Sequence, residues 1–322
     1  MQIYEFLLTF ARKLHDKMNE SNHIETNSLQ AWVLAARPKT LSGAAVPVMI
    51  GVSLAYVDSV SYVDGTFSWV AAALCLLFAF VMQIDANFIN DFFDYVNGSD
   101  DAETRLGPRR ACAQGWVKLD AMKRAISLTT CLACLVGLPL VLYGGLEMIL
   151  IGLICVVFCF LYTTHLSYMG LGDVLVVVFF GIVPVSISYY VQLHTCTWQV
   201  LTASLACGLV IDGLLLVNNF RDRDVDRSVG KNTLVVQIGE VASLWLYLGV
   251  GIVACLMGVV FWINGSVLAF VLPFIYLVLH VFTFLKIKKI NKGKALNLCL
   301  GETARNIFVY GLMVTIGLLL GH

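Results

Sequence analysis

Nine long segments of mostly apolar residues follow one another along the chain, separated by short breaks that carry polar residues or glycine. A helix needs about 20 mostly apolar residues to cross the hydrocarbon core of a bilayer. The pattern predicts such helices over approximately residues 41–57, 67–89, 121–143, 146–163, 172–192, 198–218, 241–263, 266–285 and 301–320. The segments are apolar on all sides, whereas helices of a soluble bundle are amphipathic. The sequence therefore predicts an all-α, polytopic membrane protein with nine transmembrane helices around a central cavity.

The charged residues are few and unevenly distributed. They make up 13% of the chain, with 21 Lys and Arg against 21 Asp and Glu. All 21 basic residues fall in the N-terminal segment or in the connections 90–124, 219–240 and 286–305, and the alternate connections contain none. Because basic connections stay in the cytoplasm, we expect a cytoplasmic N-terminus. This composition excludes an ordinary soluble enzyme and a nucleic-acid-binding protein that depends on net basicity.

The first 30 residues differ from the remainder. Residues 1–18 carry apolar side chains at helical spacing, namely Ile3, Phe6, Leu7, Phe10, Leu14 and Met18. Such a stripe is typical of a helix that lies in the bilayer interface, and a poorly ordered tail is the alternative. We therefore divide the chain into an N-terminal interfacial or amphipathic segment, 1–30, and one nine-helix domain, 31–322.

Two acidic clusters follow the second and sixth apolar segments. The first contains Asn90, Asp91 and Asp94, and the second contains Asp222 and Asp226. Carboxylates at the C-terminal end of a helix oppose its dipole, so they do not stabilise these helices as caps. Residues four apart share a helix face, and each cluster can therefore present several oxygen atoms together. A solvated, salt-bridged loop is the competing interpretation of either cluster alone, and the related spacing of the two favours a common binding function.

Oxygen ligands of this kind are the set that Mg²⁺ prefers, usually completed by water and substrate phosphates. The expected metal ligands are Asn90, Asp94, Asp222 and Asp226, and Asp91 and Asp94 are the expected catalytic acids. Basic side chains beside both clusters can take up phosphate charge. The candidates for diphosphate binding are Lys39, Arg105, Arg109, Arg221 and Lys231. Lys39 fits a simple membrane anchor equally well.

The motifs Asn90-Asp91-x-x-Asp94 and Asp222-x-x-x-Asp226, with Gly230-Lys231-x-Thr233-Leu234 after the second, resemble the signatures of UbiA-type intramembrane aromatic prenyltransferases. The nine predicted spans match the fold of that family, so the resemblance covers roughly residues 30–320. Within the family the chain most resembles the menaquinone-pathway branch, through the stretches Arg37-Pro38-Lys39-Thr40-Leu41, Leu106-Gly107-Pro108-Arg109-Arg110, Ala113-Gln114-Gly115-Trp116, Gly170-Leu171-Gly172-Asp173 and Asn218-Asn219-Phe220-Arg221-Asp222. Relatives often have a third acid where this chain has Gly98, and Asp100 is the candidate substitute.

The resemblance implies transfer of a polyprenyl group from polyprenyl diphosphate to 1,4-dihydroxy-2-naphthoate. Diphosphate and carbon dioxide would leave and demethylmenaquinone would form, with Mg²⁺ as cofactor. It also implies a multi-pass protein of the bacterial cytoplasmic (inner) membrane, embedded in the lipid bilayer, with its active site toward the cytoplasm. Tyr162, at the end of the fourth span, is a candidate for orienting the acceptor or the allylic cation, or is an ordinary interfacial tyrosine. Phe88 and Phe92 are candidates for cation–π stabilisation of that cation, or pack as ordinary core residues.

Other interpretations stay open at the level of sequence. Another branch of the same family would use 4-hydroxybenzoate or homogentisate as its acceptor. Asp85 and Asp212 lie within predicted spans, where acids are functional candidates, and with Asp100 they could contact the acceptor or support the metal ligands. As an ion path, the two intramembrane acids would instead indicate a transporter. That interpretation requires ionisable residues across to the outer face, and the outer halves of the spans carry almost none.

Overall fold

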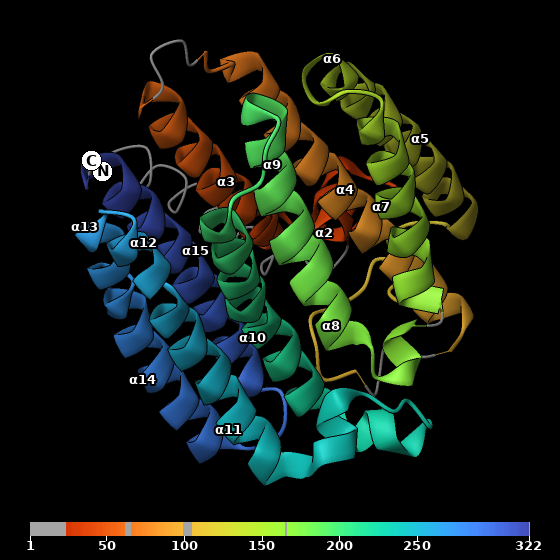
Figure 1. The fold of residues 1–322 in the computed structure, drawn as a ribbon. Helices are drawn as coiled ribbons and strands as arrows, with labels where there is room; N and C mark the ends of the chain where they lie inside the picture. Colours follow the sequence, from red (N-terminus) through yellow and green to blue (C-terminus); the bar gives the residue numbers. More distant parts are fainter. Residues whose placement is uncertain (1–23, 62–65, 99–104, 165, 322) are drawn as a thin grey trace.

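The computed structural model describes residues 24–61, 66–98, 105–164 and 166–321, and within these ranges every regular element is a helix (Figure 1). Much of the predicted interfacial segment, up to residue 23, therefore lies outside the described residues. In chain order the elements are α2 (Leu29–Ala36), η1 (Pro38–Thr40), α3 (Leu41–Ser61), α4 (Trp69–Val96), α5 (Leu119–Gly137), η2 (Leu138–Leu140), α6 (Val141–Gly144), α7 (Glu147–Thr164), η3 (Leu166–Met169), α8 (Gly172–Val177), η4 (Val178–Ile182), α9 (Val183–Leu193), α10 (Trp198–Ser228), α11 (Leu234–Met257), α12 (Val259–Ile263), α13 (Val267–Val271), α14 (Phe274–Ile290) and α15 (Leu296–Leu320).

The predicted number of spans is confirmed. Within the described residues, nine helical segments are long and apolar enough to cross a membrane. They are Leu29–Val60, Trp69–Val96, Leu119–Gly144, Glu147–Thr164, Gly172–Leu193, Trp198–Ser228, Leu234–Ile263, Val267–Ile290 and Leu296–Leu320. Three of them change helix near Pro139, Pro184 or Pro273, because each proline removes one backbone donor from a helical ladder, whereas α3 continues through Pro47.

Two helices continue well past the apolar runs that predict them. The apolar part of α4 ends near residue 89, yet the helix continues to Val96, and α10 continues from residue 218 to Ser228. No proline or glycine interrupts either extension, and each stops just before Gly98 or Gly230, whose φ values are positive. Both acidic clusters therefore lie on helices rather than in loops, with the spacing of a helix face.

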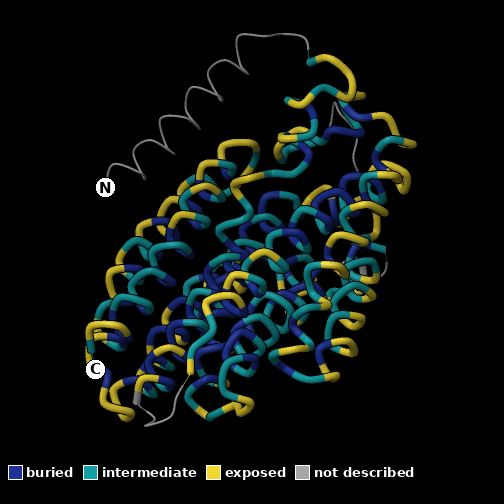
Figure 2. The backbone as a smooth tube through the Cα atoms, turned by 90° about the horizontal axis from the view of Figure 1, so that it is seen from above, coloured by how far each residue is buried: buried dark blue, intermediate teal, exposed yellow. Residues whose placement is uncertain are grey.

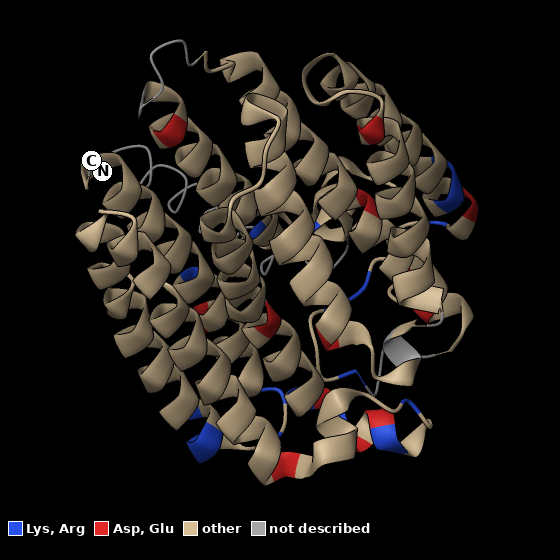
Figure 3. Ribbon diagram, in the orientation of Figure 1, with Lys and Arg blue, Asp and Glu red and all other residues tan. Residues whose placement is uncertain are grey.

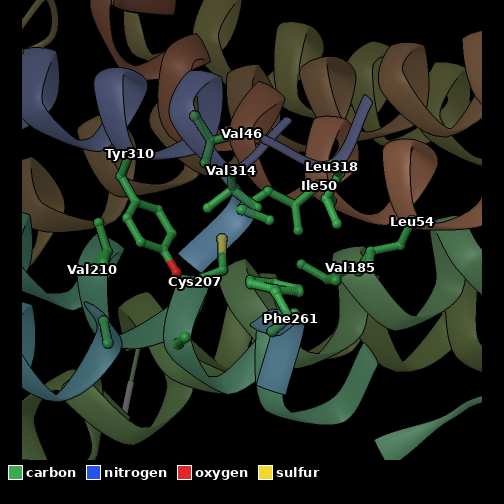
Figure 4. Close-up of a cluster of buried hydrophobic side chains, with 14 of the residues drawn as sticks. Val46, Ile50, Leu54, Val185, Cys207, Val210, Phe261, Tyr310, Val314 and Leu318 are labelled. Carbon is green, nitrogen blue, oxygen red and sulfur yellow. The ribbon is translucent and has the colours of Figure 1, made fainter. Parts of the chain in front are cut away.

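Helix α10 lies at the centre of the bundle, where α3, α8, α9, α11 and α15 pack around it (Figure 1). Its buried Cys207 and Val210 meet Tyr310 and Val314 of α15 and Val46 of α3 in the main apolar core (Figure 4). The backbone tube in Figure 2 shows the same arrangement, with buried segments gathered in the interior and exposed ones on the periphery. The central helix thus carries the second acidic cluster on a fixed support.

The crossing of α10 with η4 depends on glycine. A Cβ atom at Gly181 would lie 2.5 Å from the Cα atom of Gly208, and one at Gly208 would lie 2.7 Å from the carbonyl oxygen of Val177. Real Cβ atoms do not approach backbone this closely, so neither position accepts a side chain without movement. The π-helical turn η4 packs directly on the α10 backbone as a result and holds α8 beside the middle of α10.

One end of the bundle carries all the basic residues of the described ranges, and we call it the basic end. It contains the C-terminal ends of α4, α7, α10 and α14 together with the connections 105–118, 229–233 and 291–295. In Figure 3 no loop at the upper, opposite end is blue. A hydrogen bond of 2.9 Å from Asn297 Nδ2, in the first turn of α15, to the Leu106 carbonyl ties the connection 105–118 to that helix across the bundle.

Candidate active site

The helices enclose a cavity of about 1600 Å³ that extends from the basic end into the apolar interior. Its lining reaches from Lys231 at the basic end to Leu138 and Met148 near the opposite end. The charged residues that line it all come from the basic end, namely Arg37, Lys39, Asp94, Arg105, Arg110, Asp173, Lys231 and Arg305. The remaining lining is mostly apolar. A charged end joined to an apolar chamber suits an amphiphilic molecule with an anionic head and a hydrocarbon tail.

The first acidic cluster contributes Asn90 and Asp94 to the cavity lining. Both lie on the same face of α4, as their spacing of four predicts. The hydroxyl group of Thr163 on α7 donates a hydrogen bond to Asn90 Oδ1. Arg110 Nη2 donates to Asp94 Oδ2 at 3.3 Å. Two neighbouring elements thus fix the orientation of these two side chains at the mouth of the cavity.

Asp91 points away from the cavity and is 1% exposed. Its Oδ2 and Oδ1 atoms accept hydrogen bonds from the backbone N–H groups of Ala111 and Cys112, each at 2.9 Å. Arg37 Nη2 lies 3.8 Å from Asp91 Oδ2. Both carboxylate oxygens are therefore used to fix the connection between α4 and α5. Asp91 thus holds this connection, and its predicted catalytic role stays a prediction.

Lys231 joins the two acidic clusters. Its Nζ atom lies 3.8 Å from Asp226 Oδ1, and its charge also interacts with Asp94 on the facing helix. The Lys231 backbone N–H donates to the Asp226 carbonyl at 2.9 Å, which holds the turn after α10. Asp226 Oδ2 is buried and has no hydrogen-bond partner in the described part of the chain. The carboxylates of α4 and α10 thus share one cation at the end of the cavity.

Arg105 is a second cation between the clusters. Its charge interacts with Asp94 of α4 and Asp222 of α10, and its Nε donates to the Pro108 carbonyl at 2.8 Å. Burial and the neighbouring charge of Arg37 lower the pKa of Arg105 to about 10. A guanidinium with that pKa is still protonated at neutral pH, so Arg105 remains a cation on the cavity wall.

Gly107 allows the connection that carries Arg105 to lie against α10. A Cβ atom there would lie 2.7 Å from Arg221 Nη2 and 3.3 Å from Arg105 Nη2. Both guanidinium groups therefore pack on a stretch of backbone that has no side chain. Asn297 completes the contact, because it donates to the Leu106 carbonyl and accepts from Arg221 Nη1 at 2.9 Å. This connection is fixed from α4, α10 and α15 at once.

Arg221, a predicted diphosphate ligand, uses its whole guanidinium group in contacts with protein side chains. Its Nε and Nη2 atoms donate to the two carboxylate oxygens of Asp222, with the Nε bond at 2.8 Å, and Nη2 also donates to Asn218 Oδ1. With Nη1 on Asn297, every guanidinium nitrogen has a protein acceptor. Arg221 is 2% exposed and does not line the cavity. Its role is to orient Asp222, so the predicted metal ligand and its neighbour act as one unit.

Arg109, another predicted diphosphate ligand, is exposed and does not line the cavity. The next residue, Arg110, occupies the cavity wall instead and pairs with Asp94. Adjacent side chains in a connection point in different directions. Because the connection has no regular spacing, the sequence does not indicate which of the two arginines faces the cavity.

The remaining predicted acids lie apart from the acidic clusters. Asp85 does not line the cavity, and its two oxygens accept hydrogen bonds from the hydroxyl groups of Thr129, at 2.5 Å, and Thr130, at 2.7 Å. It therefore joins α4 to α5, and its predicted contact with the acceptor or support of the metal ligands stays a prediction. Asp212 lies buried in α10 beside Asp173 of α8. Asp100 lies outside the described residues.

The structure therefore sorts the predicted residues into those that line the cavity and those that do not. The predicted residues on the cavity wall are Lys39, Asn90, Asp94, Arg105, Tyr162 and Lys231. Sequence reasoning missed several others that share this wall, namely Arg37, Arg110, Asp173, Asn219, Asn297 and Arg305. Arg37, Arg110 and Asp173 belong to the stretches that carry the family resemblance, which was the available signal for them. Asn297 and Arg305 come from α15, and no motif marks them.

The aromatic residues beside the first cluster are not in the cavity. Phe88 packs edge-on against Trp32 at 5.7 Å, and the ammonium group of Lys123 lies 5.6 Å from the centre of the Phe92 ring. Phe158 and Phe179 instead face the cavity, with ring centroids 5.0 Å apart. Phe88 and Phe92 therefore contact other side chains outside the cavity lining, and their stabilisation of the allylic cation stays a prediction.

The oxygen atoms at the basic end fit a Mg²⁺ ion that is completed by its substrate. No group of three or more His, Cys, Asp or Glu side chains in the described ranges forms a ready metal site. Mg²⁺ is usually held by one or two carboxylates plus water and substrate phosphates rather than by a complete protein cage. Asp94 and the buried, unpartnered Asp226 Oδ2 supply carboxylates from two facing helices. This donor set suits magnesium and leaves room for diphosphate oxygens.

The structure defines a class of membrane protein. Nine spans of the described ranges enclose a central cavity, and its charged end lies between α4 and α10, the helices that carry the acidic clusters, beside several basic side chains. Residues 44–300 match the UbiA prenyltransferase family. The chain belongs to this family.

Relatives and solved structures agree with the assignment. A 1,4-dihydroxy-2-naphthoate octaprenyltransferase of Escherichia coli is 39% identical over 66% of this chain and 70% of its own length. A protein of the same description from Mycobacterium tuberculosis is 33% identical over 70% of this chain and 76% of its own length. Among solved structures, a UbiA homologue from Aeropyrum pernix superposes with a TM-score of 0.64 at 12% identity, covering 86% of this chain and 96% of its own. A homologue from Archaeoglobus fulgidus bound to DMAPP and Mg²⁺ gives a TM-score of 0.59 at 14% identity, over 88% of this chain and 99% of its own. These structures share the fold.

Proposed function

We propose that the protein transfers a polyprenyl group from polyprenyl diphosphate to 1,4-dihydroxy-2-naphthoate, with loss of diphosphate and carbon dioxide, to give demethylmenaquinol, the reduced form of demethylmenaquinone. The observation that carries the proposal is the position of Lys231, which interacts with Asp94 and Asp226 where the apolar cavity ends. A diphosphate head bound there would leave its hydrocarbon tail in the chamber. Relatives that are up to 39% identical and bear the name of this activity support the choice of acceptor.

The proposed metal ligands are Asn90, Asp94, Asp222 and Asp226, with Asp94 and Asp226 as the principal carboxylates. Mg²⁺ bound there would neutralise the negative charge that develops on the departing diphosphate. The Archaeoglobus homologue, whose structure contains DMAPP and Mg²⁺, supports this combination of ligands for the fold. Arg221 would keep Asp222 in place, and Asp91 would keep the neighbouring connection in place.

The proposed contribution of the chain's own cations is to bind and stabilise the diphosphate. Arg105 and Lys231 lie between the two acidic helices, and Lys39 lines the same end of the cavity. Positive groups that are fixed before the substrate arrives stabilise developing charge without reorganisation of solvent. Breaking the allylic C–O bond would then leave the electron pair on a diphosphate that is already surrounded by cations.

The apolar part of the cavity would protect the allylic cation from water. Phe158 and Phe179 face this region, and Tyr162 lies between it and the charged end. The faces of aromatic rings attract a cation, and this attraction is stronger where water is excluded. We propose that Tyr162 orients the acceptor or the cation here. The size of the chamber supports a long prenyl tail as the donor.

We also propose that the basic end faces the cytoplasm of a bacterial cell and that the protein resides in the cytoplasmic membrane. The basic residues of the described ranges lie at one end of the bundle, and basic connections are retained on the cytoplasmic side of a membrane. Cysteine accessibility provides a test. Cys196, in the connection between α9 and α10 at the opposite end, would react with an impermeant thiol reagent added outside intact cells. Protection of Cys196 in cells, with reaction only after lysis, would reverse the orientation.

The reaction is tested with the full chain in lipid nanodiscs. The assay contains Mg²⁺, a polyprenyl diphosphate and dihydroxynaphthoate labelled at its carboxyl carbon. We expect diphosphate and labelled carbon dioxide in equal amounts, and none of either after chelation of the metal. Prenylation of 4-hydroxybenzoate or homogentisate in preference to the naphthoate would move the protein to another branch of the family. Absence of metal-dependent turnover on any aromatic acceptor would refute the proposed function and favour the transporter interpretation.

A further inference from the structure

Two carboxyl groups outside both acidic clusters meet beside the cavity. Asp173 is the second residue of α8, and Asp212 lies in the middle of α10. They are 7% and 4% exposed, and their carboxyl groups interact directly with each other. The packing of the two helices agrees with this contact. A Cβ atom at Gly172 would lie 3.4 Å from the Leu215 side chain, one turn along α10 from Asp212.

The pair has hydrogen-bonding capacity that the protein does not use. Asp173 Oδ1, Asp173 Oδ2 and Asp212 Oδ1 are buried and accept no hydrogen bond from the described residues. Asp85 is a useful contrast, because it is also a buried intramembrane acid and both of its oxygens accept from threonine hydroxyl groups. A structural contact satisfies its polar atoms as Asp85 does. Asp173 lines the cavity, so its unused oxygens can be reached by a substrate.

Electrostatics then determines what such a pair holds. Two adjacent carboxylates in an apolar environment repel each other strongly, so they share one proton and carry one negative charge together. No Lys or Arg of the described residues forms an ion pair with either acid. The pair can therefore donate one hydrogen bond, accept others and take up a further proton.

Tyr162 connects the pair with the diphosphate end of the cavity. Its side chain interacts with Asp173 and Asp212 and also with Asp94. Its hydroxyl oxygen lies 3.9 Å from the position that a Cβ atom of Gly172 would occupy. The pair is thus next to Tyr162, while Asp94 belongs to the metal and diphosphate end. An aromatic ring that attacks the allylic carbon has to lie beside that end, within reach of this pair.

The geometry points to Asp173 and Asp212 as the carboxyl pair that binds a hydroxyl group of the aromatic acceptor and carries its proton during the reaction. This inference rests on the proposed function and adds the group that handles the acceptor. Asp173, on the cavity wall, contacts the hydroxyl group, and Asp212 positions Asp173 and holds the shared proton.

The proton balance of the reaction requires such a group. When the ring carbon that bears the carboxylate bonds to the allylic carbon, the C–O bond to diphosphate breaks and its electron pair leaves on the diphosphate. The neighbouring hydroxyl proton passes to Asp173, and the O–H electron pair forms a ring ketone. Carbon dioxide then leaves, the electron pair of the broken C–C bond returns to the ring, and Asp173 gives the proton back to the ketone oxygen. The pair therefore ends in its starting state.

The test compares Asp173→Asn and Asp212→Asn with wild type in the naphthoate assay. General acid–base groups contribute roughly 10²- to 10⁴-fold to rate, so we expect kcat of Asp173→Asn to fall at least 100-fold. We expect a smaller loss, about tenfold, for Asp212→Asn, since Asp173 keeps its carboxylate there. Mg²⁺-dependent binding of polyprenyl diphosphate should stay within threefold of wild type in both variants. Asp58→Asn is the matched control, since Asp58 accepts a hydrogen bond from Tyr189 on another face of the bundle.

Two further measurements separate proton transfer from a structural role. A fluorinated naphthoate with a more acidic hydroxyl group should restore activity to Asp173→Asn by more than it changes wild type, and Asp173→Glu should recover part of kcat. Wild-type kcat in Asp173→Asn would overturn the inference. The inference would also be overturned if Asp173→Asn lost diphosphate binding and thermal stability together with its activity, and the acidic acceptor did not restore that activity. An inactive wild type would instead reject the proposed function itself, so the two failures are distinguishable.

Discussion

Replacing Asp91 by asparagine should loosen the connection that carries Arg105 and Arg110 while leaving the metal ligands unchanged. The Asp91 carboxylate accepts the backbone N–H groups of Ala111 and Cys112, each at 2.9 Å. Asparagine keeps one acceptor oxygen and turns an NH₂ group toward the other N–H donor. One buried amide then loses its partner, and the remaining bond loses its charge.

The magnitude follows from those two bonds. A hydrogen bond to a charged group contributes about 1.5–3 kcal/mol, and a buried donor without a partner costs about 1–3 kcal/mol. We therefore expect the connection to open about 2–4 kcal/mol more easily, which corresponds to a roughly 30- to 1000-fold higher open population. Because the open connection withdraws Arg105 from the cavity wall, KM for polyprenyl diphosphate should rise as well.

Hydrogen exchange of the full chain in nanodiscs, read by mass spectrometry over residues 106–117, measures the opening. The matched control is Asp120→Asn, which changes an exposed acid in the first turn of α5 and should leave exchange in this segment unchanged. If Asp91→Asn exchanges at the wild-type rate yet abolishes Mg²⁺ binding, Asp91 is a metal ligand and the positioning role is refuted.

Three further changes test other parts of the structure. Gly107→Ala puts a Cβ atom 2.7 Å from Arg221 Nη2. An overpacked contact destabilises the folded connection by about 1–3 kcal/mol, so KM for polyprenyl diphosphate should rise about tenfold. An unchanged KM would contradict the tight contact. Gly208→Ala introduces a similar clash, at 2.7 Å from the carbonyl oxygen of Val177 at the end of α8. It should lower the midpoint of thermal unfolding by about 2–6 °C, and a midpoint at or above that of wild type would contradict the crossing. Lys231→Gln should weaken polyprenyl diphosphate binding at least tenfold, since removing one partner of a partly buried charge contact costs about 1.4 kcal/mol or more. Lys288→Gln, in the last turn of α14, should not weaken it, and equal affinities in a titration of the two variants would contradict the role of Lys231.

The architecture was predictable because the length and hydropathy of a segment are enough to predict a membrane span. The nine predicted segments correspond one to one with the nine candidate spans. The ends of α4 and α10 were not predictable in the same way, since lipid determines where a helix must be apolar and not where it stops. Both helices carry their motifs beyond the apolar run, to Val96 and Ser228.

The site was predictable at regular helical spacings and not elsewhere. Asn90 and Asp94 share the cavity wall, as two residues four apart on a helix should. Asp91 shows where this reasoning fails. Its neighbour Asn90 faces the cavity, whereas the Asp91 carboxylate accepts a hydrogen bond from Ala111, 20 residues further along the chain. The same holds for Arg109 and Arg110 in a connection without regular structure.

Residues that act through tertiary contact gave no local signal at all. Asn297 reaches the Leu106 carbonyl from a helix 191 residues away along the chain. Asp173 becomes informative only once α8 is seen to pack on α10 beside Asp212. Burial and the absence of a donor identify such a pair, and neither property is visible in a sequence.

The central claim is that carboxylates from α4 and α10 hold one metal–diphosphate complex between them. Mn²⁺ in place of Mg²⁺ allows its direct measurement by electron–nuclear double resonance on the full chain with bound polyprenyl diphosphate. We predict a phosphorus coupling in wild type that is lost in both Asp94→Asn and Asp226→Asn. A coupling that persists in either variant would show that one helix alone suffices, and would contradict the shared site.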